Sequence, residues 1–170
     1  MKGKTASNRP NWIKNTCWRR CMKNTVYKTK VFVDTNVLLD FLDSDREKHR
    51  IARELFHLIY SNLVEAAVST QSILDVAYLS RKSNSVSNQD LRDAMLFLLV
   101  HTNSGYLDTF DLSAAFKDPH SDIEDNAQIS FAYNQCCDFI ITNDKKLLSR
   151  EVPKPMQVMT PEEFVDNCRA

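Results

Sequence analysis

Residues 30–42 read KVFVDTNVLLDFL, and this stretch decides the fold class. Val31, Phe32 and Val33 form a short apolar run that is typical of a buried strand. The run ends at Asp34, and residues 35–42 are predicted to form one or two helical turns. Two explanations of Asp34 stay open at this point. It could be a helix N-cap, because its side-chain oxygens accept free amide hydrogens of a first turn. It could also belong to a functional site.

Short apolar runs alternate with amphipathic segments along the rest of the chain. This rhythm is typical of a parallel sheet covered on both faces, and therefore of the α/β class. The predicted strands are residues 30–34, 64–70, 105–110, 138–144 and 156–160. The predicted helices lie within residues 45–62, 71–82, 85–103, 111–119, 121–136 and 161–168.

Helix starts are marked by capping residues. Ser87 or Asn88 is the expected N-cap of one helix, and Pro161 is expected in the first turn of the last one. Ser121 followed by Glu124 three residues later has the spacing of a capping box. These signals predict where the helices meet the strands.

The composition indicates an ordinary globular protein of one domain. The chain has 170 residues, of which 43% are hydrophobic and 26% charged, and this length is sufficient for a sizeable core. No run of about 18 apolar residues exists, so no membrane span is predicted. The N-terminus is basic but lacks the apolar middle of a secretory signal, which predicts a cytoplasmic location.

Charge divides the sequence into two parts. Residues 1–30 contain nine Lys or Arg and no Asp or Glu, whereas the remaining 140 residues contain 13 basic and 22 acidic ones. We therefore expect a basic N-terminal extension at residues 1–29 and a folded domain at residues 30–170. The extension is predicted to be a disordered tail, a mis-assigned start with Met22 as the true one, or a nucleic-acid contact.

Acidic residues follow several of the predicted strands. Right-handed crossovers bring the carboxyl ends of parallel strands to one edge, where ligands bind. Asp34 and Asp144 follow strands there, Asp75 lies in the second turn of a helix, and Asp122 and Asp125 lie near the start of another. Converging carboxylates repel one another unless a cation neutralises them, and hard oxygen donors suit Mg²⁺ or Mn²⁺. Such sites can cut phosphodiesters without a histidine base.

Four separated motifs carry a resemblance to a known family. They are VFVDTNVLLDFL (31–42), VSTQSILDVAYLSRK (68–82), SDIEDNAQISFA (121–132) and DFIITND (138–144). In this order and at these spacings the chain resembles the PIN domain family, and within it the VapC-like toxin ribonucleases or close relatives. The likeness spans about residues 30–165.

The resemblance implies a fold, an activity and partners. The fold would be a three-layer α/β/α sandwich with a central parallel sheet of about five strands. The activity would be that of an endoribonuclease dependent on Mg²⁺ or Mn²⁺, acting as the toxin of a type II toxin–antitoxin pair. The partners would be an RNA substrate, a small antitoxin protein that masks the acidic groove, and a second copy in a homodimer.

Carried over residue by residue, the resemblance also implies a site. Asp75 stands where most family members have glutamate, so its side chain is one methylene shorter and could reach the metal through water. The implied catalytic and metal-ligating residues are Asp34, Asp75, Asp125 and Asp144, with Asp122 as an auxiliary ligand and Asn36 as hydrogen-bonding support. Thr142 could hold a ligand or a water through its hydroxyl.

The remaining charged residues near the motifs have two explanations each. Arg81, Lys82, Lys145 and Lys146 could contact RNA phosphates, or could simply lie on exposed helix faces. Asp40, which follows the first motif, is expected at a solvated helix end.

Two other functions compete with a nuclease. A phosphotransferase of the haloacid-dehalogenase type also places an Asp after its first strand. However, it needs a second Asp two residues later as a general acid, and this chain has Asn36. A catalytically degenerate PIN-like module that binds RNA or protein is the other alternative, and the substitution at Asp75 is the feature in its favour.

Overall fold

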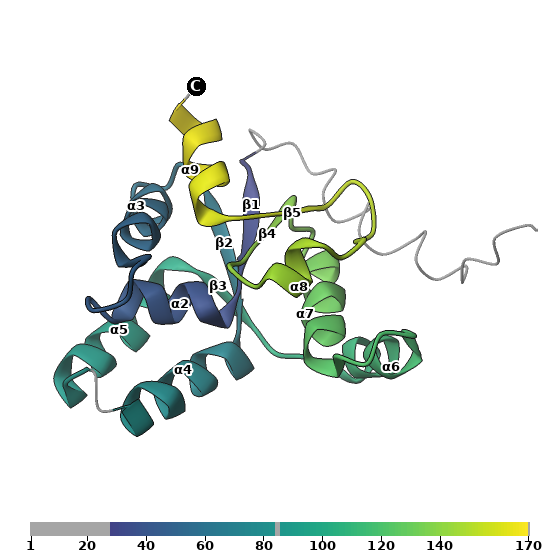
Figure 1. Ribbon diagram of the computed structural model, residues 1–170, viewed down its shortest axis with the longest axis horizontal. Coiled ribbons are helices and arrows are strands. Elements are labelled where there is room, and N and C mark those ends of the chain that lie inside the picture. The colour runs from purple at the N-terminus through teal and green to yellow at the C-terminus, as the bar shows by residue number, and fades with distance from the viewer. Residues whose placement is uncertain (1–27, 84–85, 170) are drawn as a thin grey trace, which may run out of the picture.

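A parallel five-stranded sheet forms the centre of the molecule (Figure 1). The computed structural model describes residues 28–83 and 86–169, so the predicted basic extension lies almost wholly outside the described residues. The strand order is β3-β2-β1-β4-β5, and all neighbouring strands are parallel. The bounds are β1 Lys30–Val33, β2 Glu65–Ser69, β3 Asn103–Gly105, β4 Phe139–Ile141 and β5 Gln157–Met159.

Helices cover both faces of the sheet and complete three layers, as predicted. One group lies on the left of Figure 1 and the other on the right, with the sheet between them. The first group is α2 Thr35–Leu42, α3 His49–Tyr60, α4 Thr70–Ser83, α5 Asn88–His101 and α9 Pro161–Arg169. The second group is α6 Thr109–Lys117, α7 Ile123–Asn134 and α8 Lys145–Leu148.

The side chains of β1 explain why both faces are covered. Val31 and Val33 point into the core beside α2, α3 and α9, whereas Phe32 points into the second core beside α7 and α8. All three are fully buried. A strand whose successive side chains enter two different cores must lie in the middle of a sandwich. The central strand is therefore the one whose sequence ends in Asp34.

The third strand is shorter and earlier than predicted. The prediction of a strand at residues 105–110 is wrong, because β3 ends at Gly105 and Asp108 is already the N-cap of α6. The Asp108 carboxylate accepts from the backbone N of Phe110 and Asp111, so Phe110 belongs to a helix, whereas Tyr106 and Leu107 lie in the connection before it. Gly105 lies against Phe131, since a Cβ at this position would come within 2.9 Å of the ring.

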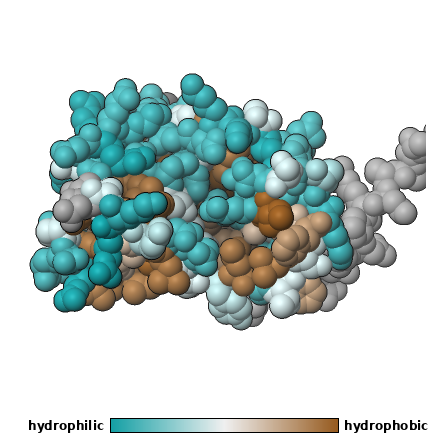
Figure 2. Space-filling model, turned by 60° about the horizontal axis from the view of Figure 1, so that its bottom comes forward, coloured by the Kyte–Doolittle hydropathy of each residue, from teal (hydrophilic) through white to brown (hydrophobic). Residues whose placement is uncertain are grey.

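The surface divides into a hydrophilic part and a part with exposed apolar side chains (Figure 2). The brown areas of Figure 2 lie on the lower side of the molecule as drawn in Figure 1. Exposed apolar residues on α4, α5 and α6 include Leu74, Tyr78, Leu96, Leu99, Val100, Phe110 and Phe116. None of the helices within residues 28–83 and 86–169 is long and apolar enough to cross a membrane.

Candidate active site

Asp34 lies at the junction of β1 and α2, at the carboxyl edge of the sheet. Its backbone N donates to Ile141 O of the neighbouring β4 at 3.1 Å, which fixes the residue to the sheet. Carboxylate oxygen Oδ1 accepts from the backbone N of Thr35 at 2.6 Å, so Asp34 is indeed the N-cap of α2. Only 6% of the residue is exposed. Capping uses only the Oδ1 oxygen of this buried carboxylate. It does not explain the position of the second oxygen, Oδ2.

The second oxygen of Asp34 is held by two side chains. Oδ2 accepts from Asn36 Nδ2 and from Thr142 Oγ1, each at 2.6 Å. Thr142 is fully buried at the end of β4, and its hydroxyl oxygen also accepts from Asn36 Nδ2 at 3.1 Å and from the backbone N of Asp144 at 2.9 Å. The structure therefore brings Asn36 and Thr142 into contact with Asp34.

Asp144 follows β4 at the same edge and caps the short helix α8. Its Oδ1 accepts from the backbone N of Lys146 at 2.7 Å. This helix was not predicted, because four residues are too few to show an apolar period. The negative charge of Asp144 raises the pKa of Asp34, so the two strand-end carboxylates share one electrostatic environment.

The amino end of α7 contributes three more acidic residues. Asp122 is its N-cap and accepts from the backbone N of Asp125 at 3.3 Å. The predicted capping box of Ser121 and Glu124 is wrong, because Asp122 takes the cap position. The Glu124 carboxylate accepts from Gln128 Nε2 at 3.3 Å instead. The carboxylates gather at a helix amino end, where the helix dipole favours negative charge.

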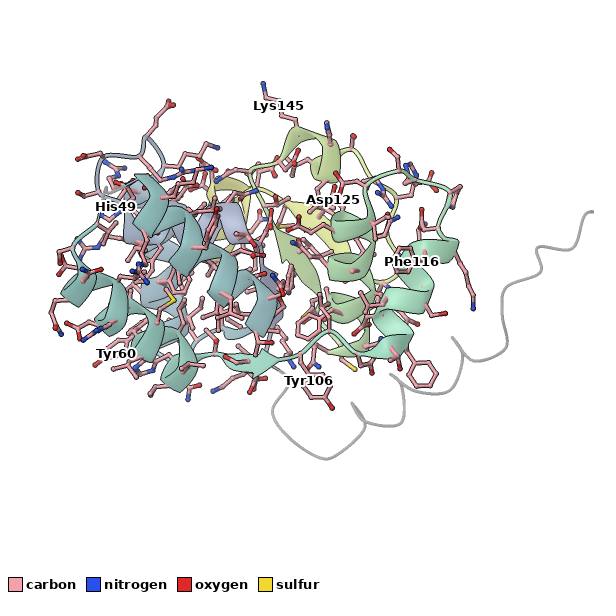
Figure 3. All side chains as sticks on the ribbon, turned by 90° about the horizontal axis from the view of Figure 1, so that it is seen from below. His49, Tyr60, Tyr106, Phe116, Asp125 and Lys145 are labelled. Carbon is pink, nitrogen blue, oxygen red and sulfur yellow. The ribbon has the colours of Figure 1, made fainter. Side chains whose placement is uncertain are left out.

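Asp75 faces this group from α4. It is half-buried in the second turn of that helix and accepts from Gln71 Nε2 at 2.8 Å. Burial raises the pKa of Glu124, and the charges of Asp75, Asp34 and Asp122 raise it further. Glu124 was not among the predicted site residues, although its place in the first turn of α7 could have indicated it. Figure 3, seen from the side of this edge, shows Asp125 on α7, with α4 and α5 across from it.

The carboxylates raise one another's pKa values. Burial is the largest cause for Asp34, whose pKa is raised despite the hydrogen bonds from Thr142 and Thr35. For Asp125, burial and the charges of Asp122, Asp144 and Asp34 raise the pKa to about 6, although Arg150 opposes the shift. Carboxylates that protonate more easily than usual indicate a surplus of negative charge.

This surplus gives the metal-free chain a pH-dependent stability. Between the ordinary pKa of 3.8 and about 6, folded Asp125 holds a proton that the unfolded chain has lost. Stability therefore decreases as the pH rises through this window. We expect the thermal midpoint measured with chelator to be about 2–4 °C higher near pH 5 than near pH 7. Asp125→Asn should show a smaller difference, and an equal difference in both proteins would contradict the assignment.

The donor set fits a hard divalent cation. Carboxylate oxygens are the ligands that Mg²⁺ and Mn²⁺ prefer, and a cation would relieve the repulsion just described. Among the described residues, no three or more His, Cys, Asp or Glu side chains are already arranged around one metal position. To hold a cation there, the carboxylates must come closer together than they stand.

A polar network beside Asp34 was not predicted. Asp40 was expected at a solvated helix end, but it is 4% exposed, and its carboxylate accepts from Arg46 Nε at 2.6 Å and from Asn143 Nδ2 at 2.7 Å. Asn143 also donates its backbone N to Asn36 Oδ1 at 3.1 Å. Both ends of the Asn36 amide are therefore used, which fixes how this side chain approaches Asp34.

Arg150 is a second residue that the sequence did not indicate. Its side chain is 9% exposed, and its Nη2 donates to Asn126 Oδ1 at 2.8 Å. Asn126 is the residue that follows Asp125 in the sequence. Asn126 in turn donates to Ala115 O and His120 O. The guanidinium therefore ties the segment after α8 to the amino end of α7. Its Nε is buried and has no hydrogen-bond partner among the described residues.

The four predicted RNA-contacting residues lie at helix ends and are exposed. Arg81 and Lys82 are in the last turn of α4, and Lys145 and Lys146 are in α8. In Figure 3 Lys145 projects from the periphery of the molecule. Their contact with RNA stays a prediction.

Comparisons with known proteins agree with this fold. The family model described as PIN domain matches residues 30–146. The chain is 27% identical over 140 residues to ribonuclease VapC1 of Aquifex aeolicus (strain VF5), covering 81% of this chain and 94% of that protein.

Two solved structures are similar in fold. VapC20 of Mycobacterium tuberculosis, described as a sarcin–ricin loop cleaving toxin, has a TM-score of 0.58 and 11% identity, covering 73% of this chain and 97% of its own. A chain of VapBC2 from Rickettsia felis, solved with a DNA fragment from its promoter, has a TM-score of 0.54 and 12% identity. The match covers 78% of this chain and 98% of the VapBC2 chain. The predicted three-layer fold and the resemblance are confirmed: the chain belongs to the PIN domain family.

Proposed function

We propose that this protein is a metal-dependent endoribonuclease of the VapC kind, which hydrolyses RNA phosphodiester bonds as the toxin of a toxin–antitoxin pair. The observation that carries the proposal is the buried carboxylate of Asp34 surrounded by further acidic side chains. Asp144 and Asp125 lie close enough for their charges to interact with it. The match to the PIN domain model and the likeness to ribonuclease VapC1 support the same activity.

In this proposal Asp34, Asp125 and Asp144 would hold Mg²⁺ or Mn²⁺, with Asp75 and Asp122 at the rim. A divalent cation bound there lowers the pKa of a bound water and neutralises charge on the leaving oxygen. Other residues of the chain hold the metal-binding carboxylates in position. Thr142 and Asn36 fix the Asp34 carboxylate by hydrogen bonds of 2.6 Å, and Thr142 also fixes the turn that carries Asp144.

A small antitoxin, a second copy of the chain and a cytoplasmic location belong to the same proposal. The exposed apolar side chains on α4, α5 and α6 support protein partners, because large exposed apolar areas mark interaction surfaces. The likeness to a chain of the VapBC2 complex supports an antitoxin among them.

The test is cleavage of RNA by the purified full chain, with Mg²⁺, with Mn²⁺ or with chelator. A mixture of transfer RNA, ribosomal RNA and synthetic single strands covers the main classes of substrate. We expect cutting with either ion and none with chelator, because the carboxylate cluster alone has no group that activates water. Cutting at the same rate in chelator would contradict the mechanism.

A degenerate binding module is the second candidate. The shorter side chain at Asp75, and the lack of a ready-made arrangement of metal ligands among the described residues, favour it. Calorimetry would separate the two, because Mn²⁺ binding without cleavage of any RNA supports the module. The phosphotransferase alternative has lost support, since both ends of the Asn36 amide are already hydrogen-bonded and an amide cannot act as a general acid.

A further inference from the structure

A cationic groove lies between α3 and α9. Its volume is about 460 Å³, and it is lined by Arg50, Arg53, Glu54 and His57 of α3 and by Val165 and Arg169 of α9, with Leu58 at its base. Residues 31–170 contain 13 basic and 22 acidic residues. Three of these thirteen basic residues therefore collect around one groove on an otherwise acidic domain, with a single glutamate between them.

Glu54 is paired with two of the three guanidinium groups, with Arg50 along α3 and with Arg169 across the groove; Arg169 Nη1 also lies 3.5 Å from Asp166 Oδ1 of α9. Its Oε2 accepts from Arg169 Nη2 at 2.6 Å, and its Oε1 lies 3.6 Å from Arg50 Nε. The Arg50 side chain is 93% exposed, so most of its donors face solvent. Arg53 makes no ion pair or hydrogen bond within the described part of the chain. Exposed ion pairs add little to stability, so stability alone does not explain this gathering.

Lys48, the residue before α3, contacts the segment that carries Asp144. It donates from Nζ to Asn143 Oδ1 at 2.8 Å and lies 3.2 Å from Glu162 Oε1 in the first turn of α9. Lys48 is not part of the groove lining. Arg50, Arg53 and His57, which do line the groove, follow it at helical spacing along one side of α3, a helix about 18 Å long. Basic side chains therefore continue along α3 from the Lys48–Asn143 contact into the α3–α9 groove.

We propose that the α3–α9 groove binds backbone phosphates of the RNA substrate on one side of the cut bond. This inference rests on the proposed nuclease function. Guanidinium groups bind phosphate oxygens through paired N–H donors, and an acidic site needs cations nearby to accept a polyanion. The groove lies on a different helix pair from the exposed apolar residues of α4, α5 and α6, and its charge suits a polyanion better than an apolar partner.

The first test is binding of a labelled long single-stranded RNA, measured by fluorescence anisotropy at several salt concentrations. The full chain carries Asp34→Asn so that the RNA stays intact. Arg53→Ala should weaken binding about tenfold and reduce the salt slope by about one, because one phosphate contact is lost. Arg53→Lys should keep the slope. The matched control is Arg92→Ala, an exposed arginine on α5, which should bind RNA as tightly as the parent.

Unchanged affinity in Arg53→Ala, or an equal loss in Arg92→Ala, would overturn the assignment. Unchanged affinity would mean that the groove does not bind RNA and that its ligand is another anion, such as an acidic protein segment. The second test compares cleavage of the long RNA with that of a trinucleotide that fills only the carboxylate site. Arg53→Ala should raise KM for the long RNA and leave trinucleotide cleavage unchanged.

The outcomes distinguish this proposal from the nuclease proposal. Metal-dependent cleavage with no effect of Arg53→Ala on the long RNA overturns the groove and keeps the nuclease. Binding that depends on Arg53, in a chain that cleaves nothing under any condition, supports the groove as an RNA site and overturns the nuclease.

Discussion

Asp34→Asn is expected to lower RNA cleavage by more than about 100-fold, which exceeds the 10–100-fold loss typical when only an outer partner of a metal ligand is removed. The substitution removes the buried charge that would hold the cation. It leaves a good N-cap, because the amide oxygen can still accept from the backbone N of Thr35. The rate should be measured on one RNA with Mn²⁺ in excess, so that weaker metal affinity alone cannot explain the loss.

The fold should survive this change. The pKa of Asp34 is raised chiefly by burial, so its ionised form is destabilised in the metal-free chain. Removing this charge stabilises the metal-free chain, but the asparagine can no longer accept at both positions from the backbone N of Thr35 and from Asn36 Nδ2 and Thr142 Oγ1. The two effects oppose each other, so the thermal midpoint of Asp34→Asn without metal should stay within about 4 °C of that of the parent. Asp108→Asn is the matched control, since Asp108 caps α6 in the same way but lies outside the cluster. Full cleavage by Asp34→Asn would remove Asp34 from the mechanism.

Thr142→Val should lower cleavage by about 10–100-fold and the unfolding free energy by about 1–3 kcal/mol. Valine keeps the shape of threonine but has no hydroxyl. The Asp34 carboxylate then loses a donor at 2.6 Å, and the backbone N of Asp144 and the amide of Asn36 lose an acceptor. Because Thr142 is fully buried, water cannot easily replace these bonds.

Thr142→Ser separates the effect of the Thr142 hydroxyl group from the effect of its methyl group on packing. It keeps the oxygen and removes one methyl group, so cleavage should stay within a few-fold of the parent while stability decreases modestly. Mn²⁺ affinity from calorimetry should decrease in the valine variant and not in the serine variant. Equal cleavage by both variants would mean that the threonine is there for packing alone.

The sequence predicted the part of the site that follows from strand ends. Asp34 and Asp144 were found because each follows an apolar run, and parallel strands bring such residues to one edge. Asn36 and Thr142 belong to the same motifs, and the structure brings both side chains into contact with Asp34. The apolar run of residues 31–33 predicted a buried strand, and the structure adds that this strand lies at the centre of the sheet.

The missed features depend on partners far away in the chain. No local pattern marks Asp40 as buried; its carboxylate is held by Arg46 and by Asn143, which lies 103 residues later in the chain. Arg150 is bonded to Asn126, 24 residues earlier, with no local pattern to reveal it. The third strand was misplaced because Asn103–Gly105 has no apolar alternation, being an edge strand with mostly exposed side chains.

The position of the site within the sheet has a consequence for heat and denaturant. Asp34 and Thr142 end the adjacent strands β1 and β4, each of which has a strand on both sides, and the amide of Asp34 is bonded to Ile141 O. Segments of this kind open last, together with the whole domain, whereas peripheral helices open first. Partial fraying of α6 would therefore leave Asp34 and Thr142 in place, but it would loosen the amino end of α7, because Asn126 donates to Ala115 O and His120 O. The strand-end half of the site should persist until the domain itself melts, whereas the half that carries Asp125 should be lost earlier on heating.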